Sequence, residues 1–185
     1  MSGNGKAEWV FGYGSLIWNP EFEPADRGIA TVEGYRRSFC MSSIHHRGSE
    51  AEPGLVLALD AAEGGVCRGV AFRLPDTGQE AVLAALRERE LVSSAYREVR
   101  LPARLDDGRQ VEALAYVIDR DHRQYCASLT LEDQARIIAS AHGGKGPNHD
   151  YLWQTAAHLS ALGIADAELD HLSALVREIV DKRLA

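Results

Sequence analysis

The order of strand-like and helix-like segments constrains the fold of this chain more than any other feature. Up to about residue 74, short β-type runs alternate with turn residues, whereas the last third of the chain is helical. One helix and two more strand-like runs lie between these parts. Because strands and helices do not alternate regularly, a doubly wound parallel sheet is disfavoured. The order predicts an α+β fold with a mainly antiparallel sheet or small barrel and helices packed on it.

Individual elements follow from the same patterns. We expect strands in EWVF, RRSFCMSS, GLVLALD, VCRGVAFRL, AYREVRLPARL and VEALAYVI, with a turn at Asp106, Asp107 and Gly108 between the last two. We expect the last helices in TLEDQARIIASAH, HDYLWQTAAHLSAL and ADAELDHLSALVREIVDKRL. The 185 residues suit one domain, which we place at residues 9–185, after a polar, flexible N-terminal tail at residues 1–8.

Composition and charge narrow the classes of function. The chain is 45% hydrophobic and 25% charged, as in ordinary globular proteins, and no apolar run is long enough to span a membrane. Its net charge of -7 argues against general binding of nucleic acid or anionic membranes, but it allows a small anionic ligand in a local pocket. Cys40, Cys67 and Cys126 form no CxxC pair, so a disulfide framework is not expected and a reducing cytoplasm fits best.

The segment VFGYGSLIW, residues 10–18, ends a strand on small residues. The glycine spacing does not complete a dinucleotide-binding motif, because Ile17 stands where a third small residue is required. Neither this segment nor GGKGPN ends like a phosphate-binding P-loop, and no glycine follows Ser15 at the spacing of a nucleophile elbow. What remains is a loop that exposes backbone N–H groups, which can hold an anion or a developing oxyanion.

The helix expected at residues 77–91 carries the most informative acid. The sequence TGQE at its start matches a capping box, which sets the register of the helix. At 100° per residue, Glu90 falls on the apolar stripe that runs through Val82 and Leu86. Glu88 lies roughly 160° away from Glu90 and faces water. One acid of the RERE run is therefore turned inward.

A carboxylate on an apolar stripe has two interpretations. Partial desolvation raises its pKa toward neutrality, which suits a general base. Alternatively, Glu90 forms a structural ion pair with Arg87, Arg89 or Arg97 near the helix end. The helix considered alone favours the structural ion pair, because acids at helix ends are commonly structural.

Other candidate groups give weaker signals. His45 and His46 suggest a metal ligand, but no further ligand accompanies them at a recognisable spacing. His142 and His149 flank a glycine-rich loop, and we interpret them as solvated or capping residues. No motif marks out a Ser-His-Asp or Cys-His arrangement. We therefore expect neither a metal site nor covalent catalysis.

Several short elements together identify a family resemblance. They are VFGYGSLIW, GYRRSF, HHRG followed by EPG, GVAFRLP, an Arg-Glu pair followed by an aromatic residue, and NHDYL. In this order they resemble the ChaC family of γ-glutamylcyclotransferases over about residues 9–152. YGSL is shared with the wider superfamily, whereas HRG and GVAFRLP look specific to the ChaC branch. The resemblance implies a γ-glutamylcyclotransferase-like mixed, mainly antiparallel β-barrel with packed helices and a helical C-terminal third.

The resemblance also implies a reaction and a set of site residues. Members of this family convert glutathione to 5-oxoproline and cysteinylglycine without a metal or organic cofactor. The catalytic acid of the family falls on Glu90. The residues implied to bind substrate are Phe11, Gly12, Tyr13, Gly14, Ser15, Leu16, Arg37, Tyr116 and Tyr151. For the last three, a buried tyrosine with one hydrogen bond or a surface arginine is an alternative of about equal weight.

This reaction explains why no nucleophile is evident in the sequence. The α-amino group of a γ-glutamyl compound can attack its own γ-carbonyl, and such intramolecular attack reaches effective molarities on the order of 10⁵–10⁸ M. Glu90 would transfer the protons, while the backbone of residues 12–16 binds substrate. Two alternatives stay open: a cyclotransferase for other γ-glutamyl peptides or γ-glutamylamines, and a non-enzymatic ligand-binding or cation-transport regulatory protein.

One position departs from the family pattern. Where relatives tend to have glycine shortly before the aromatic residue, this chain has Ser93, Ser94 and Ala95 before Tyr96. If that position needs a positive φ, Ser94 strains the turn that follows Glu90. The presentation of Glu90, but not its identity, depends on this turn.

HRG is expected to form a loop packed beside the site, and Trp9 and Val10 are expected to be structural. In both cases we expect the residues to support the site without taking part in catalysis. They follow from the same resemblance and from the position of these residues in the strand that leads into the glycine loop.

Overall fold

Five strands close into a barrel at the centre of the computed structural model, which describes residues 8–126 and 128–185. The strands are β1 (Trp9–Gly12), β2 (Asp26–Ser43), β3 (Gly54–Arg73), β4 (Tyr96–Leu105) and β5 (Gln110–Ile118). Their order around the barrel is β1-β3-β2-β4-β5. The pairs β1–β5 and β3–β5 are parallel and the others are antiparallel. The predicted mixed, mainly antiparallel barrel is confirmed.

Alternation of side chains along the strands builds the core. Trp9 and Phe11 of β1 join the main hydrophobic cluster, whereas Val10 between them joins a second cluster on the other face. In β5, Ala113 belongs to the main cluster and Leu114 to the second. β1 and β5 therefore each present one set of side chains to the main core and the other to the second cluster.

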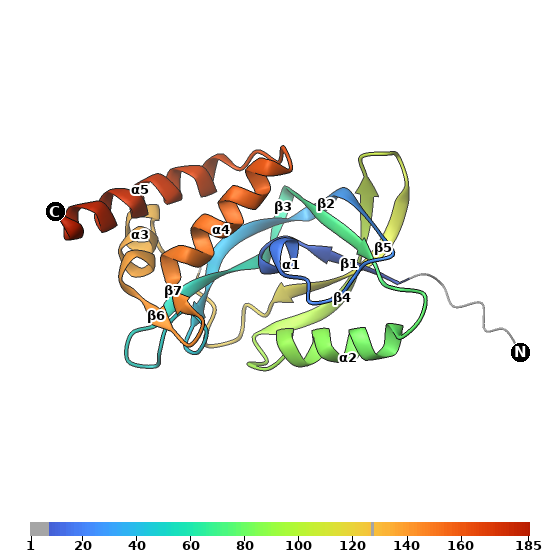
Figure 1. Ribbon diagram of the computed structural model, residues 1–185, viewed down its shortest axis with the longest axis horizontal. Helices are drawn as coiled ribbons and strands as arrows, with labels where there is room; N and C mark the ends of the chain where they lie inside the picture. Colours follow the sequence, from blue (N-terminus) through green and yellow to red (C-terminus); the bar gives the residue numbers. More distant parts are fainter. Residues whose placement is uncertain (1–7, 127) are drawn as a thin grey trace, which may run out of the picture.

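Helices cover the barrel on different sides (Figure 1). They are α1 (Ser15–Trp18), α2 (Gln79–Glu90), α3 (Leu131–Ser140), α4 (Asn148–Ala161) and α5 (Ala167–Leu184). Helices α3, α4 and α5 pack together near the C-terminus, which confirms the predicted helical last third, while α2 lies apart from them. A short hairpin of β6 (His142–Gly143) and β7 (Gly146–Pro147) joins α3 to α4. Within the described part of the chain, no helix combines the length and apolar character needed to cross a membrane.

Some elements differ from their predicted bounds because pairing overrides local sequence. Strand β2 begins at Asp26, well before the predicted RRSFCMSS run. The two runs predicted as separate strands near residues 54–60 and 66–74 form the single strand β3. β2 and β3 pair along almost their whole length, with register shifts at Glu33/Tyr35 and Ser38/Met41. This pairing carries the strand through polar and glycine-containing segments that show no alternation.

The capping box predicted at the start of α2 does not form. Helix α2 begins at Gln79, and its cap position is Gly78, with φ 75° and no side-chain cap. Thr77 therefore lies one position too early to bind the N-terminal amides. The predicted phase is nevertheless correct, since Leu86 is buried in the second cluster and Glu88 is exposed.

The predicted tail at residues 1–8 lies outside the described residues except for Glu8. The Glu8 carbonyl accepts a hydrogen bond from the Leu74 amide at 2.9 Å. Its carboxylate accepts two more from the Arg100 guanidinium, at 2.9 and 3.1 Å. Glu8 is therefore attached to the folded domain by these hydrogen bonds.

Candidate active site

A cavity of about 510 Å³ opens beside the segment that follows β1. Its walls come from residues 13–19, the end of α2, the loop at residues 43–47, the β6–β7 hairpin and α4. Seven of the ten predicted site residues line it: Tyr13, Gly14, Ser15, Leu16, Glu90, Tyr116 and Tyr151. Residues far apart in the sequence are thus brought around one space.

Phe11, Gly12 and Arg37 are not among the described residues that line this cavity. Phe11 is fully buried in the main core. The Arg37 guanidinium donates to the carbonyl of Tyr13 and forms an ion pair with Asp166 at 3.0 Å. These residues lie behind the loop, so the structure does not place them in contact with a ligand as predicted. They are positioned to support the loop instead.

Glu90 is the last residue of α2 and its carboxylate faces the cavity. The side chain is 14% exposed, and its Oε1 lies 3.3 Å from Nε of Arg89. Arg87 and Arg97, the other candidate partners, form ion pairs elsewhere. The predicted ion pair therefore exists, and its partner among the three candidate arginines is Arg89, which also lines the cavity.

Burial dominates the electrostatics of Glu90. It raises the pKa of the carboxyl above its ordinary value, and the charge of Glu21 raises the pKa further. The positive charges of Arg89 and Lys145 act in the opposite direction and lower the pKa. Since burial is the largest of these causes, the Glu90 carboxylate is a stronger proton acceptor than an exposed glutamate.

Arg89 connects Glu90 to the glycine-containing loop. Its guanidinium donates to the hydroxyl of Ser15 at 3.0 Å and to the carbonyl of Asn19 at 2.6 Å. It also lies 3.4 Å from the carboxylate of Glu21. The helical pattern identified Arg89 only as a possible ion-pair partner of Glu90. A pattern within one helix carries no information on contacts with Ser15 and Asn19, which lie about 70 residues earlier in the sequence. One side chain thus couples the acid to α1.

Gly14 leaves room where the loop meets α4 and β3. A Cβ at this position would lie 3.3 Å from the hydroxyl of Tyr151 and 3.6 Å from the side chain of Leu57. The close approach of the Tyr151 hydroxyl therefore favours glycine at this position. Helix α1 starts at Ser15, and the first amides of a helix have no acceptor within the helix. The amide of Ile17 donates to the carbonyl of Gly14 at 3.0 Å, so the predicted exposed N–H groups would be those of Ser15 and Leu16, two residues that line the cavity.

Four tyrosines among the described residues line the cavity, and their hydroxyl groups are used differently. Tyr13 and Tyr96 donate to backbone carbonyls at 2.7 and 2.8 Å, and Tyr116 donates to a glutamate at 3.1 Å. The hydroxyl of Tyr151 instead accepts from the amide of Leu57 at 3.2 Å, and its own proton has no acceptor among the described residues. Burial raises the pKa of all four, so they stay protonated. Tyr151 is therefore the one with a proton to offer a ligand.

The Asn-x-x-Tyr element explains how Tyr151 is held in place. The Asn148 side chain, fully buried, accepts from the amide of Leu55 and donates to its carbonyl, both at 2.8 Å. One helical turn later, Tyr151 binds the amide of Leu57 on the same strand. The start of α4 is thus attached to β3 at two points, which directs the hydroxyl of Tyr151 toward Gly14.

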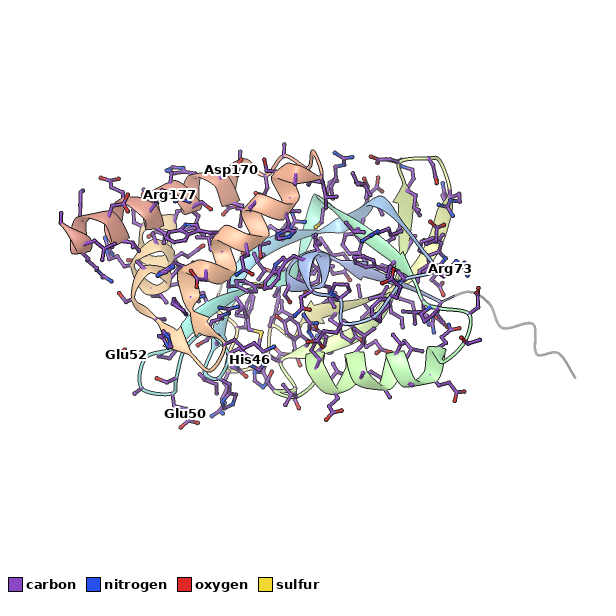
Figure 2. All side chains as sticks on the ribbon, viewed as in Figure 1. His46, Glu50, Glu52, Arg73, Asp170 and Arg177 are labelled. Carbon is purple, nitrogen blue, oxygen red and sulfur yellow. The ribbon has the colours of Figure 1, made fainter. Side chains whose placement is uncertain are left out.

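The HRG loop forms another wall of the cavity, beside the site as predicted. The amides of Gly144 and Lys145 donate to the carbonyls of His45 and His46 at 2.8 and 2.9 Å, which ties this loop to the β6–β7 hairpin. Figure 2 shows His46 near that hairpin. A Cβ on Gly48 would overlap the backbone of the EPG segment, so close approach of the two segments requires glycine.

The remaining candidate groups do not assemble into a second site. Among the described residues, no cluster of three or more His, Cys, Asp or Glu side chains could hold a metal ion. His142 is exposed, and His149 contacts Asp150 at 3.1 Å. Burial raises the pKa of the Cys40 thiol to about 12, which makes it a poor nucleophile.

The turn after Glu90 holds Ser94 in the left-handed region, with φ 58°. This is the conformation inferred for the position at which relatives tend to have glycine. A side chain other than glycine is strained there by roughly 1–2 kcal/mol. The chain therefore accepts strain four residues after its candidate catalytic acid.

We expect Ser94→Gly to stabilise the protein by about 0.5–1 kcal/mol. Relief of the strained φ exceeds the entropy that glycine adds to the unfolded chain. Urea unfolding measures this as a higher midpoint at an unchanged slope. Ser93→Gly is the matched control and should destabilise, because the hydroxyl of Ser93 accepts from the amide of Ala95. Equal effects of the two substitutions would contradict the assignment of strain to Ser94.

Comparison with known proteins gives consistent matches. A family model described as ChaC-like protein matches residues 8–182. The chain is 37% identical over 172 residues to the glutathione-specific γ-glutamylcyclotransferase of Escherichia coli (strain K12). The aligned region covers 93% of this chain and 74% of that protein. It is 34% identical over 176 residues to glutathione-specific γ-glutamylcyclotransferase 1 of Homo sapiens, and this aligned region covers 94% of this chain and 79% of that protein.

A solved structure supports the fold independently. The crystal structure of a γ-glutamyl cyclotransferase specific to glutathione from yeast superposes with a TM-score of 0.85 and 23% identity. The superposition covers 94% of this chain and 97% of that chain. At this level of identity, the similarity establishes that the two chains share the barrel and its covering helices.

Proposed function

The chain belongs to the ChaC-like protein family, and from this premise we propose that it is a glutathione-specific γ-glutamylcyclotransferase, a lyase. It would convert glutathione to 5-oxoproline and cysteinylglycine. The observation that carries the proposal is the position of Glu90, a buried acid in the wall of a cavity that also contains residues 14–16. The names of the relatives support glutathione as the substrate.

The reaction needs proton transfers rather than a protein nucleophile. The α-ammonium group of the substrate loses a proton, and the resulting amine attacks the γ-carbonyl carbon to form a five-membered ring. The attacking nitrogen then loses a second proton, and the bond between the γ-carbon and the cysteine nitrogen breaks. The leaving nitrogen gains both protons. Bound geometry makes this attack efficient, because the two reacting groups belong to one molecule.

Glu90 is assigned both proton transfers. A carboxylate whose pKa is raised by burial accepts a proton from the ammonium and can return it to the leaving nitrogen. Arg89 holds this carboxylate from one side while it binds the hydroxyl of Ser15 from the other. The acid is thereby fixed beside the loop that receives the γ-glutamyl group.

The developing oxyanion is assigned to the backbone of the loop and to Tyr151. The amides at the start of α1 and the hydroxyl of Tyr151 are hydrogen-bond donors in the same cavity, and Gly14 brings them close together. One well-placed donor is worth roughly 10²–10³ in rate. Phe11, Gly12 and Arg37 support the loop from behind, and Tyr116 helps to shape the cavity.

We place the protein in the cytoplasm on chemical grounds. Its described cysteines are all free, and reduced glutathione is a thiol of reducing compartments. The proposed chemistry requires neither a metal nor an organic cofactor, since the substrate supplies the nucleophile.

A comparison of three substrates tests the proposal. The purified protein, with a chelator present, is incubated separately with reduced glutathione, γ-glutamyl-alanine and γ-glutamyl-lysine, and 5-oxoproline is measured. We expect product from glutathione and little from the other two. Activity confined to another γ-glutamyl donor would overturn the choice of substrate. Binding of glutathione without any product would favour the non-enzymatic alternative.

A further inference from the structure

The cavity is positive although the chain has a net charge of -7. Its described lining includes three permanent cations, Arg47, Arg89 and Lys145, and one acid, Glu90. Arg89 is paired with that acid and with Glu21. Arg47 and Lys145 have no acidic ion-pair partner among the described residues. The cavity therefore contains an excess of two positive charges, which favours a ligand with more than one negative group.

Arg47 is buried in a way that leaves its hydrogen-bonding capacity largely unused. Its exposed fraction is 7%, and among the described residues its guanidinium makes one side-chain hydrogen bond, to the carbonyl of Pro147 at 3.2 Å. The guanidinium also lies over the ring of Tyr151, 5.7 Å from its centroid. A guanidinium carries five N–H donors, and its burial is unfavourable without an anion. Within the described part of the chain no carboxylate lies at ion-pair distance from Arg47, although the charge of Asp150 acts on its guanidinium and raises its pKa.

Lys145 lies on the same wall as Arg47. It sits in the turn of the β6–β7 hairpin, and its amide binds the carbonyl of His46 at 2.9 Å. A Cβ on the next residue, Gly146, would lie 3.6 Å from Nη1 of Arg47, so the guanidinium touches this turn. The two unpaired cations therefore come from two loops that are joined by backbone hydrogen bonds.

Glutathione has two carboxylates, which must occupy different parts of the cavity. The α-carboxylate shares a carbon atom with the attacking amine, so it stays close to Glu90 and residues 14–16. The carboxylate of the terminal glycine lies farther away, because three extended residues span about 10 Å. The wall that contains Arg47 and Lys145 is formed by other segments of the chain than the wall that contains residues 14–16 and Glu90.

We propose that Arg47 and Lys145 bind the terminal carboxylate of the leaving peptide, and that they thereby select γ-glutamyl peptides over γ-glutamylamines. This inference rests on the proposed function and extends it to the leaving group. The pair acts on substrate binding, although the charge of Lys145 also lowers the pKa of Glu90. Its contribution is a charge-assisted contact that a neutral leaving group cannot make.

Glutathione and its C-terminal amide provide the test, because they differ only in this carboxylate. For the unmodified protein, we expect kcat/KM to be about 10- to 100-fold higher with glutathione than with the amide. Lys145→Met should lower kcat/KM for glutathione about 10-fold more than for the amide, mainly through KM. Lys145 also lowers the pKa of Glu90, so its replacement should move the acid limb of the pH–rate profile to higher pH for both substrates alike, and the ratio of the two kcat/KM values is the quantity that tests the inference. The side chain of Lys145 is exposed, so its replacement does not disturb the core.

Arg47→Lys is the second variant. It keeps the positive charge but loses the planar fork that binds a carboxylate through two hydrogen bonds, so it should also lower the preference for glutathione. Lys182→Met is the matched control, since Lys182 forms a surface pair with Glu178 on α5 and should change neither substrate.

Two results would overturn the inference. If Lys145→Met and Arg47→Lys change kcat/KM for glutathione and for its amide by the same factor, or change neither value, these cations do not bind the terminal carboxylate. If the unmodified protein forms no 5-oxoproline from either substrate, the proposed function fails and this inference fails with it. The two failures can be told apart. If only this inference is wrong, both variants still form 5-oxoproline and still prefer glutathione over the amide. If the proposed function is wrong, no 5-oxoproline forms at all.

Discussion

Glu90→Gln is expected to remove cyclisation almost completely, with kcat lowered by about 10³–10⁴-fold. Glutamine has nearly the same shape as glutamate, but it cannot take a proton from the substrate ammonium. General acid–base catalysis contributes roughly 10²–10⁴ in rate, and Glu90 is assigned two proton transfers. The rate of 5-oxoproline formation measures the loss. Binding of glutathione, measured by calorimetry, should change little.

The same substitution should make the fold more stable at neutral pH. Burial raises the pKa of Glu90 in the folded state, so the folded state holds this proton more tightly than the unfolded state does. The resulting stability is present below the unfolded pKa and is lost as the pH rises through the folded pKa. Glutamine carries no charge, so the variant avoids that loss. Its urea midpoint should exceed that of the unmodified protein at pH 7, and the difference should shrink in acid.

The stability measurement separates the two interpretations of this acid. If Glu90 served mainly as a structural ion-pair partner of Arg89, glutamine would lower stability at neutral pH. Glu88→Gln is the matched control on the same helix, because Glu88 is exposed and should affect neither turnover nor stability. Near-normal turnover of the Glu90→Gln variant would contradict its assignment as the catalytic acid.

Arg89→Met is expected to lower kcat/KM by about 10²-fold. The substitution removes the contact with Glu90 and the hydrogen bonds to Ser15 and Asn19, so both the acid and the loop lose a fixed position. Misplacement of reacting groups by about 1 Å can cost this much. Arg89 also lowers the pKa of Glu90, so its removal should move the acid limb of the pH–rate profile to higher pH.

The pH profile distinguishes positioning of the acid from a general structural defect. After Arg89 is removed, Lys145 still lowers the pKa of Glu90 and Glu21 still raises it. Arg89→Lys keeps the charge and should retain most of the original acid limb while it loses the fork that binds the loop. Arg136→Met, at a surface pair on α3, serves as the control. A slower Arg89→Met enzyme with an unshifted acid limb would show that Arg89 does not tune Glu90.

The fold was predictable where local pattern and pairing agree. Alternation marks β1 and β5, and the late run of helical segments is clear from the sequence. The first half of β2 was missed because residues 26–35 contain charged residues and glycines, and it is a strand through its pairing with β3. The capping box failed because Gly78 adopts a left-handed conformation that displaces Thr77 from the cap position.

The candidate site shows the same division between local and distant information. The inward direction of Glu90 follows from the period of a single helix, and the strain at Ser94 could be anticipated from one position in a turn. The contact of Arg89 with Ser15, and the place of Arg37 behind the loop, depend on how the chain folds back on itself. Lys145 lies in a glycine-rich turn that offers no periodic signal, so only the closed cavity identifies it.

The fate of the substrate nitrogen tests the central claim most directly. The purified protein is given glutathione labelled with ¹⁵N at the α-amine, in water enriched in ¹⁸O and with a chelator present, and the products are analysed by mass spectrometry. We expect 5-oxoproline that retains ¹⁵N and contains no ¹⁸O, together with an equal amount of cysteinylglycine. Release of glutamate that contains ¹⁸O would show that water, rather than the amine of the substrate, attacks the γ-carbonyl, and would contradict the mechanism.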